Sequence, residues 1–228
     1  MAILARNDLY PLALGNEFKK SAEARGLQAV YFEKYAIGTL DHAAAVTQIG
    51  AAKPDWIIAT GYINDLILIR QQMADQKVTA KVITGINGPQ YKEWIDAVGA
   101  IGNGVTTASW FHSSVRYKSD DLFGSTENFV RLFDAKYHSE PDFTQASGSA
   151  IGVILQMAIE KAGTLDRNKV RSILADSEFK TFFAPIKFGP DGEANSYVPP
   201  IFQIQNRKVV VIYPDAIKQA ELQPVAGN

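Results

Sequence analysis

The chain has 228 residues, of which 46% are hydrophobic and 21% are charged, an ordinary composition for a folded protein with one large domain or two small ones. Its formal net charge is −1 and the charged residues are scattered rather than clustered, so no surface for nucleic acid or for an anionic membrane is predicted. The chain has no cysteine, which excludes disulfides, thiolate catalysis and cysteine-bound metals.

The chain up to residue 110 alternates between apolar runs rich in β-branched residues and segments with helical spacing. The apolar runs predict strands buried on both faces, at residues 3–4, 27–32, 56–59, 81–84 and 104–108. The helical segments lie between them, at residues 12–24, 41–52, 64–75 and 91–100. Asp41 and Asn64 are placed to cap the second and third of these helices. The alternation predicts an α/β fold with a doubly wound parallel sheet, in which ligands bind at the carboxyl ends of the strands.

The pattern changes after residue 111. Residues 112–124 lose their periodicity and predict a crossover or linker. Helices without intervening strands follow, at residues 126–136, 145–162 and 167–175. The last third is β-like, with a strand at 186–188 and then a hairpin formed by 201–205 and 209–213 around a turn at 206–207.

Several short motifs occur in a characteristic order along nearly the whole chain. They are Asn7–Tyr10 after the first strand, Gly61–Tyr62 after the third strand, Ala158–Gly163 at a helix end, Pro185–Gly192, and Lys208–Pro214 at the close. Each motif alone is weak, but their order and spacing together resemble the type I periplasmic solute-binding proteins typified by the leucine/isoleucine/valine-binding protein of ABC transporters.

The resemblance implies two α/β lobes joined by three crossovers, with the ligand trapped between the lobes by hinge closure. It assigns residues 1–111 and 196–214 to the second lobe, 112–195 to a crossover and an incomplete, mostly helical first lobe, and 215–228 to a tail. It also implies that an N-terminal βα stretch, which builds most of the first lobe's sheet, is missing from this chain.

A missing sheet would leave the helices of the first lobe partly uncovered. Their apolar residues would then form an exposed patch larger than soluble monomers usually tolerate; these residues are Phe129, Leu132, Phe133, Ile151, Leu155 and Ile159. We therefore expect a homo-oligomer or a segment-swapped dimer, unless a separate polypeptide supplies the missing part.

The resemblance places ligand contacts directly after strands of the second lobe. Tyr10 and Tyr62 follow the first and third strands, and each offers an apolar ring with a polar tip. Asn87 stands where amino-acid binders carry a carboxylate for the ligand's ammonium group, and an amide cannot neutralise a cation, so a simple α-amino acid is not favoured. Trp110, at the exit from the lobe, is expected in the pocket wall or the hinge. The alternatives are a helix staple for Tyr10, a plain turn at Asn87, and core packing for Trp110.

Enzyme signatures are absent from the sequence. There is no Gly-rich phosphate loop, no nucleophile elbow and no His-Glu-x-x-His motif. Residues 177–180 match a Ser-x-x-Lys pattern but lack its companion motifs. His42, His112 and His138 are far apart and have no carboxylate at a partner spacing. We therefore predict no enzyme, no catalytic or metal site, and no cofactor.

The resemblance implies the substrate-binding component of an ABC importer, which takes an amino acid-like solute, an amide or an aromatic acid and delivers it to a membrane permease. It also implies a periplasmic location, although the chain itself carries no signal peptide and no apolar stretch of the roughly 20 residues that span a bilayer. The alternative is a truncated remnant or an oligomerising interaction protein without ligand capture. An α/β enzyme or a response-regulator-like domain is a more distant alternative.

Overall fold

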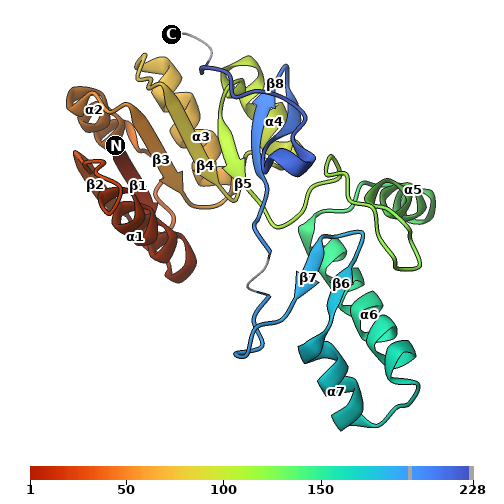
Figure 1. Cartoon of the computed structure of the whole chain (residues 1–228). Coiled ribbons are helices and arrows are strands. Elements are labelled where there is room, and N and C mark those ends of the chain that lie inside the picture. Colours follow the sequence, from red (N-terminus) through yellow and green to blue (C-terminus); the bar gives the residue numbers. More distant parts are fainter. Residues whose placement is uncertain (195–196, 226–228) are drawn as a thin grey trace. The chain divides into compact units, whose positions relative to one another are not determined.

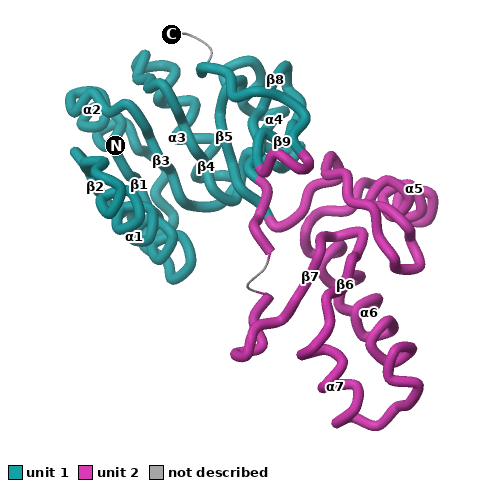
Figure 2. Tube along the Cα trace, viewed as in Figure 1, with its two compact units in different colours: residues 1–109, 201–213, 218–228 teal, residues 110–200, 214–217 magenta. Residues whose placement is uncertain are grey.

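The computed structural model describes residues 1–194 and 197–225. Two compact units make up the chain (Figure 2). Unit 1 contains residues 1–109, 201–213 and the chain from 218 on, and unit 2 contains residues 110–200 and 214–217. The boundary predicted between residues 195 and 196 lies outside the described residues.

Unit 1 is built on one seven-stranded sheet (Figure 1). Its strands, in chain order, are β1 (Ala2–Arg6), β2 (Tyr31–Tyr35), β3 (Trp56–Thr60), β4 (Val82–Ile86), β5 (Thr106–Ala108), β8 (Ile201–Gln205) and β9 (Lys208–Tyr213). Across the sheet they lie in the order β2-β1-β3-β4-β5-β8-β9. The first five run parallel, and β8 is antiparallel to both β5 and β9. The predicted α/β class with a parallel sheet is confirmed.

Helices separate the parallel strands of unit 1. They are α1 (Leu9–Glu23), α2 (Ala43–Ala52), α3 (Ile63–Asp75), α4 (Lys92–Val98) and the short 3₁₀ helix η1 (Gly99–Gly102). Ile3, Leu4, Ile57 and Ile58 point alternately to opposite faces of the sheet, and all four have no exposed surface. Helices must therefore cover both faces, because a parallel sheet of this kind cannot leave either face in water.

Two details of unit 1 differ from the sequence prediction. The second strand is residues 31–35 rather than 27–32, because β2 is an edge strand that pairs only with β1 and tolerates the charges of Glu33 and Lys34. Asn64 does not cap the third helix. The helix begins one residue earlier, after Tyr62, whose backbone N–H donates to Asp65 Oδ2 at 3.1 Å.

Unit 2 is mostly helical. It contains α5 (Thr126–Tyr137), α6 (Phe143–Ala162), α7 (Arg167–Asp176), a two-stranded sheet of β6 (Glu178–Lys180) and β7 (Pro185–Lys187), and the 3₁₀ helix η2 (Asp215–Ile217). Ser125, Asp142 and Asp166 cap the amino ends of its three α-helices. The sequence prediction missed β6, because three residues are too short for a strand pattern.

The core of unit 2 is aromatic. The rings of Phe129 and Phe182 stack with centroids 3.8 Å apart, and Phe111 and Phe123 pack edge-on against both. Phe129 was expected on the exposed helix face, but it is only 3% exposed because it faces this cluster. The prediction was wrong for this residue. Other apolar side chains of the same helices remain exposed, namely Leu132, Ile151 and Leu155.

The segment after residue 217 lies against unit 1. Gln203 Nε2 donates to the carbonyl of Gln223 at 2.7 Å, and Gln205 Nε2 donates to the carbonyl of Glu221 at 2.8 Å. Val225 is buried beside Gly104, where a Cβ atom would come within 2.4 Å of Val225 Cα. Two buried amide side chains of β8 therefore anchor this segment. The last three residues of the predicted tail lie outside the described residues.

Candidate functional site

A hollow of about 420 Å³ lies in unit 1 at the carboxyl ends of β1, β3 and β4. Its lining residues are Arg6, Tyr62, Ile63, Asn64, Asp65, Asn87, Tyr91 and Glu93. They come from the last residue of β1, the turns after β3 and β4, and the first turns of α3 and α4. Loops and helix amino ends converge at this edge of a parallel sheet, which is where such folds bind their ligands.

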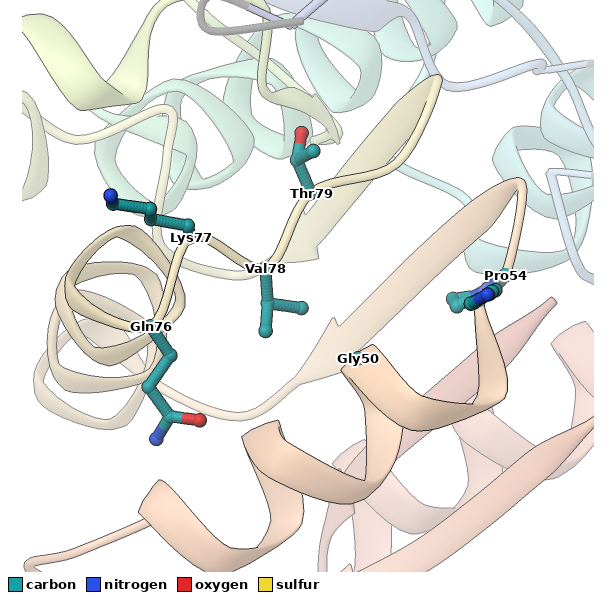
Figure 3. A pocket seen from close by; sticks show the side chains of 7 residues that line it. Gly50, Pro54, Gln76, Lys77, Val78 and Thr79 are labelled. Atoms are coloured by element: carbon teal, nitrogen blue, oxygen red, sulfur yellow. The ribbon is translucent and has the colours of Figure 1, made fainter.

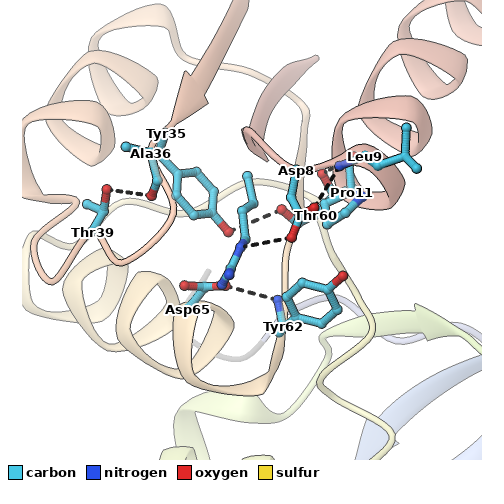
Figure 4. A network of polar contacts seen from close by, with 10 residues as sticks. Asp8, Leu9, Pro11, Tyr35, Ala36, Thr39, Thr60, Tyr62 and Asp65 are labelled. Atoms are coloured by element: carbon cyan, nitrogen blue, oxygen red, sulfur yellow. Dashed lines mark hydrogen bonds and ion pairs between the residues drawn. The ribbon is translucent and has the colours of Figure 1, made fainter.

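An ion pair joins two of these elements. Arg6 Nη1 donates to Asp65 Oδ2 at 2.8 Å, and Asp65 is only 7% exposed. The same carboxylate oxygen accepts the backbone N–H of Tyr62 (Figure 4). The Arg6 guanidinium carbon lies 4.9 Å from the centre of the Tyr62 ring. Its hydrogen bond to Asp65 raises the pKa of Arg6, so the guanidinium stays charged.

A second set of contacts lies beside the ion pair (Figure 4). The Tyr35 hydroxyl donates to the Thr60 carbonyl at 3.2 Å, and Thr60 Oγ1 donates to the Pro11 carbonyl at 2.8 Å. These bonds join the ends of β2 and β3 to the first turn of α1. A Cβ atom on Gly61 would lie 2.2 Å from the Tyr35 hydroxyl, so any larger residue at this position would have to displace that hydroxyl. Burial raises the pKa of Tyr35, which keeps the phenol neutral.

His42 is buried beside the Tyr35 ring, with ring centroids 4.6 Å apart. Burial lowers the pKa of His42, although Asp65, Asp41 and Glu33 oppose that shift. The His42 imidazole packs edge-on against the Tyr35 ring, and it is not among the residues that line the hollow.

The predicted site residues occupy different places. Tyr62 and Asn87 line the hollow. Tyr10 does not line it. It lies in the first turn of α1 and is 47% exposed, and burial, followed by the nearby Tyr62, raises its pKa. Trp110 belongs to unit 2, where it is 49% exposed and its ring centre lies 5.7 Å from that of Tyr197. The Tyr197 hydroxyl also donates to the Trp110 carbonyl.

Asn87 has a left-handed backbone with φ of +74°. Asparagine tolerates this conformation better than other non-glycine residues, which agrees with the turn that was the plainer interpretation of Asn87. The turn and the place in the hollow are compatible, because the same turn brings the amide to the carboxyl end of β4.

Sequence reasoning missed Arg6, Asp65, Tyr91 and Glu93. Arg6 directly precedes the Asn7–Tyr10 motif, and Asp65 is three residues after Tyr62. A systematic survey of the first polar residues after each strand and in the first turn of each helix would have found all four. Their pairing could not be found that way, because Arg6 and Asp65 are 59 residues apart in sequence.

A second hollow, of about 410 Å³, lies near the opposite ends of the strands (Figure 3). It is lined by the chain turns that follow α2 and α3, namely Gly50, Lys53, Pro54, Gln76, Lys77, Val78 and Thr79. Lys53 and Lys77 both have left-handed backbones that end these helices. Because this hollow lies before β3 and β4 rather than after them, the first hollow is the better candidate for a ligand site.

Among residues 1–194 and 197–225, no three or more histidine, aspartate or glutamate side chains are grouped so that they could hold a metal ion. Within the same residues, none of the helices combines the length and the apolar character required to cross a membrane.

The periplasmic binding protein family model matches residues 1–213. Among curated proteins, Leu/Ile/Val-binding protein homolog 7 of Brucella suis biovar 1 (strain 1330) is 22% identical over 98% of this chain. Homolog 8 of Brucella abortus (strain 2308) is 25% identical over 98% of this chain. The matches cover 57% and 56% of those two proteins, so the chain spans little more than half the length of these relatives.

Solved structures share the fold. A putative branched-chain amino acid ABC transporter protein from Silicibacter pomeroyi has a TM-score of 0.83 with 18% identity, over 99% of this chain and 60% of that chain. A leucine-binding protein from Thermotoga maritima MSB8 has a TM-score of 0.72 with 24% identity, over 95% of this chain and 61% of that chain. At these identities the likeness shows the fold alone.

Proposed function

The chain belongs to the periplasmic binding protein family, and we propose that it is part of the substrate-binding component of an ABC importer for a small solute. The family is one of binding proteins rather than enzymes, as predicted. The observation that carries the proposal is the hollow in unit 1, where Tyr62, Asn87 and Arg6 converge from three neighbouring strand ends. The names of the relatives, which include homologs of a Leu/Ile/Val-binding protein and a leucine-binding protein, agree with such a role.

We propose that unit 1 corresponds to the family's second lobe and that its hollow forms one wall of the solute site. Tyr62 and Asn87 contact the solute directly in this proposal, while Tyr10 supports Tyr62 from the first turn of α1. Trp110 acts at the exit from the lobe. The neutral amide of Asn87 favours an amide, an aromatic acid or a modified amino acid over a simple α-amino acid.

The same proposal gives the chain a place and a partner. A solute-binding protein of this family works in the periplasm and delivers its solute to a membrane permease of the ABC type. Capture then requires that the solute stabilise one conformation of the protein over another, because only differential affinity shifts such an equilibrium.

The experiment is a thermal-shift screen of the full chain against L-leucine, L-leucinamide and 4-hydroxybenzoate, followed by calorimetry of each positive solute. A true solute raises the melting temperature with concentration, because it binds the folded state. Tyr62→Ala should lower the affinity for that solute by about tenfold or more, since a few aromatic residues often carry most of the binding free energy. The control is Tyr213→Ala, a tyrosine of similar exposure at the end of β9. No thermal response to any of these solutes would contradict the proposal.

A second candidate function is self-association without solute capture. Leu132 of α5 and Ile151 and Leu155 of α6, which we together term the α5–α6 face, are 40%, 69% and 46% exposed. Exposed apolar side chains on neighbouring helix turns are typical of surfaces that another protein covers. We propose a second copy of the chain as that partner, either as a homo-oligomer or through a swapped segment.

A further inference from the structure

We infer that Arg6 and Asp65 are positioning residues, which fix Tyr62 at the hollow and make solute affinity depend on an ion pair that need not touch the solute. This inference rests on the proposed function of the hollow. Three contacts carry it, namely the 2.8 Å bond from Arg6 to Asp65, the 3.1 Å bond from the Tyr62 N–H to Asp65, and the 4.9 Å approach of Arg6 to the Tyr62 ring.

The Asp65 carboxylate is the centre of the arrangement. Its Oδ2 atom accepts both from Arg6 Nη1 and from the Tyr62 backbone, so one buried oxygen fixes the end of β1 relative to the start of α3. The Asp65 side chain is 8% exposed and that of Arg6 is 19% exposed. A charge-assisted pair with so little water around it cannot lose one member without leaving the other charge poorly solvated.

The guanidinium also restricts the Tyr62 side chain. A cation within about 6 Å of an aromatic ring centre is attracted to the ring face, and Arg6 satisfies this condition. The Tyr62 main chain and side chain are therefore held by the same ion pair, from two directions. Arg6 occupies one face of the ring, so a solute would meet the opposite face and the hydroxyl.

Further neighbours hold the ion pair itself in place. Asp8 Oδ2 lies 3.6 Å from Arg6 Nε, and the Asp8 side chain caps α1 by accepting the Leu9 N–H at 2.8 Å. On the other side, Tyr35 packs against the glycine at position 61. The guanidinium thus lies between two carboxylates that each belong to the amino end of a helix. This rigidity is what a positioning role requires.

The first test is a double-mutant cycle on solute affinity in the full chain, measured by calorimetry with L-leucine, L-leucinamide and 4-hydroxybenzoate. Arg6→Met should lower the affinity for a solute that binds by about tenfold. In a Tyr62→Ala background the same substitution should lower the affinity by less than about twofold, because its effect passes through Tyr62. Arg6→Lys should be intermediate, since it keeps the charge but not the planar group over the ring. Equal losses in both backgrounds would overturn the inference.

The control is Arg25→Met, which removes an exposed arginine whose Nη1 donates to the Ser21 carbonyl at the end of α1. It should leave solute affinity unchanged in both backgrounds. Asp65→Asn is a second variant that breaks the ion pair, in case Arg6→Met does not fold. Its amide keeps an acceptor for the Tyr62 N–H but removes the negative charge. It should reproduce the loss of affinity seen with Arg6→Met.

The second test needs no solute. In the chain labelled with 3-fluorotyrosine, the Tyr62 resonance is identified by its loss in Tyr62→Phe. Arg6→Met should move or broaden this resonance, whereas Arg25→Met should not. An unchanged Tyr62 resonance in Arg6→Met would refute the positioning role. If no solute of the panel binds, the proposed function fails, and the fluorine resonance alone decides whether the ion pair positions Tyr62.

Discussion

The two units of this chain reach stability by different means. In unit 1, short aliphatic strands lie side by side in a seven-stranded sheet, and residues such as Ile3 and Ile58 have no exposed surface. In unit 2, the sheet has two strands of three residues each, and the core is a cluster of phenylalanines around Phe182. Unit 1 repeats one packing pattern many times, whereas unit 2 depends on a few large side chains.

This difference indicates where single substitutions act most strongly. Removing one isoleucine side chain leaves the hydrogen-bonded strands around it in place, whereas removing one ring from a compact cluster takes away contacts from several other rings that form the core. Unit 2 should therefore be the more fragile of the two, and its unfolding should be separable from that of unit 1.

The largest expected effect is that of Phe182→Ala. Phe182 has no exposed surface, stacks on Phe129 at 3.8 Å and packs against Phe123 at 5.0 Å. Truncation should lower the free energy of unfolding of unit 2 by about 3–5 kcal/mol. Urea titration followed by hydrogen exchange should show the loss in α5 amides and not in β3 amides. Leu165→Ala, at a side chain that is 78% exposed, is the control.

A smaller loss is expected from Asp121→Ala. Asp121 Oδ2 accepts the Phe182 N–H at 2.7 Å, and Oδ1 accepts the Phe123 N–H at 2.9 Å. Without the carboxylate the Phe182 N–H stays buried and loses its acceptor, which should cost about 1–3 kcal/mol. Chemical denaturation measures the change. The neighbouring Asp120 is exposed, so Asp120→Ala should have little effect, and equal losses from both variants would show that the Asp121 bonds do not stabilise the cluster.

The structure of unit 1 was predicted from the sequence better than that of unit 2, because repeated buried strands leave a pattern in the sequence and a cluster of a few large side chains does not. The strands β1, β3 and β4 are apolar on both faces, so a short apolar run marks each of them. The edge strand β2 carries charges and was misplaced. In unit 2 the helices were found from their spacing and caps, but the short β6 and the burial of Phe129 were not. Three residues are too few for a strand pattern, and Phe129 is buried by Phe182, which lies far from it in the sequence.

Some residues of the candidate site could be located from the sequence and others could not. The positions of Tyr62 and Asn87 follow from where strands end, which a pattern can locate, and both residues line the hollow. The ion pair of Arg6 and Asp65 depends on a register between β1 and β3 that only the folded sheet provides. Topology can therefore indicate which edge of the sheet binds a ligand, while the polar partners at that edge require coordinates.

The smallest expected effect on stability is that of Ile151→Lys on the α5–α6 face. Ile151 is 69% exposed, so the substitution should change the free energy of unfolding by less than about 0.5 kcal/mol. Its effect on self-association should be large, since a buried and unpaired ammonium group strongly disfavours an interface. In sedimentation velocity the unsubstituted chain should form an oligomer at micromolar concentration, and Ile151→Lys should be a monomer.

The matched control is Gln156→Lys, which adds the same charge at an exposed polar position of α6. It should leave the oligomer intact, because Gln156 lies outside the α5–α6 face. A monomeric unsubstituted chain would contradict the second copy as the partner. An oligomer that survives Ile151→Lys would mean that its interface lies elsewhere. Either result would remove self-association through the α5–α6 face as a property of unit 2, and the contrast with unit 1 would then rest on the aromatic core alone.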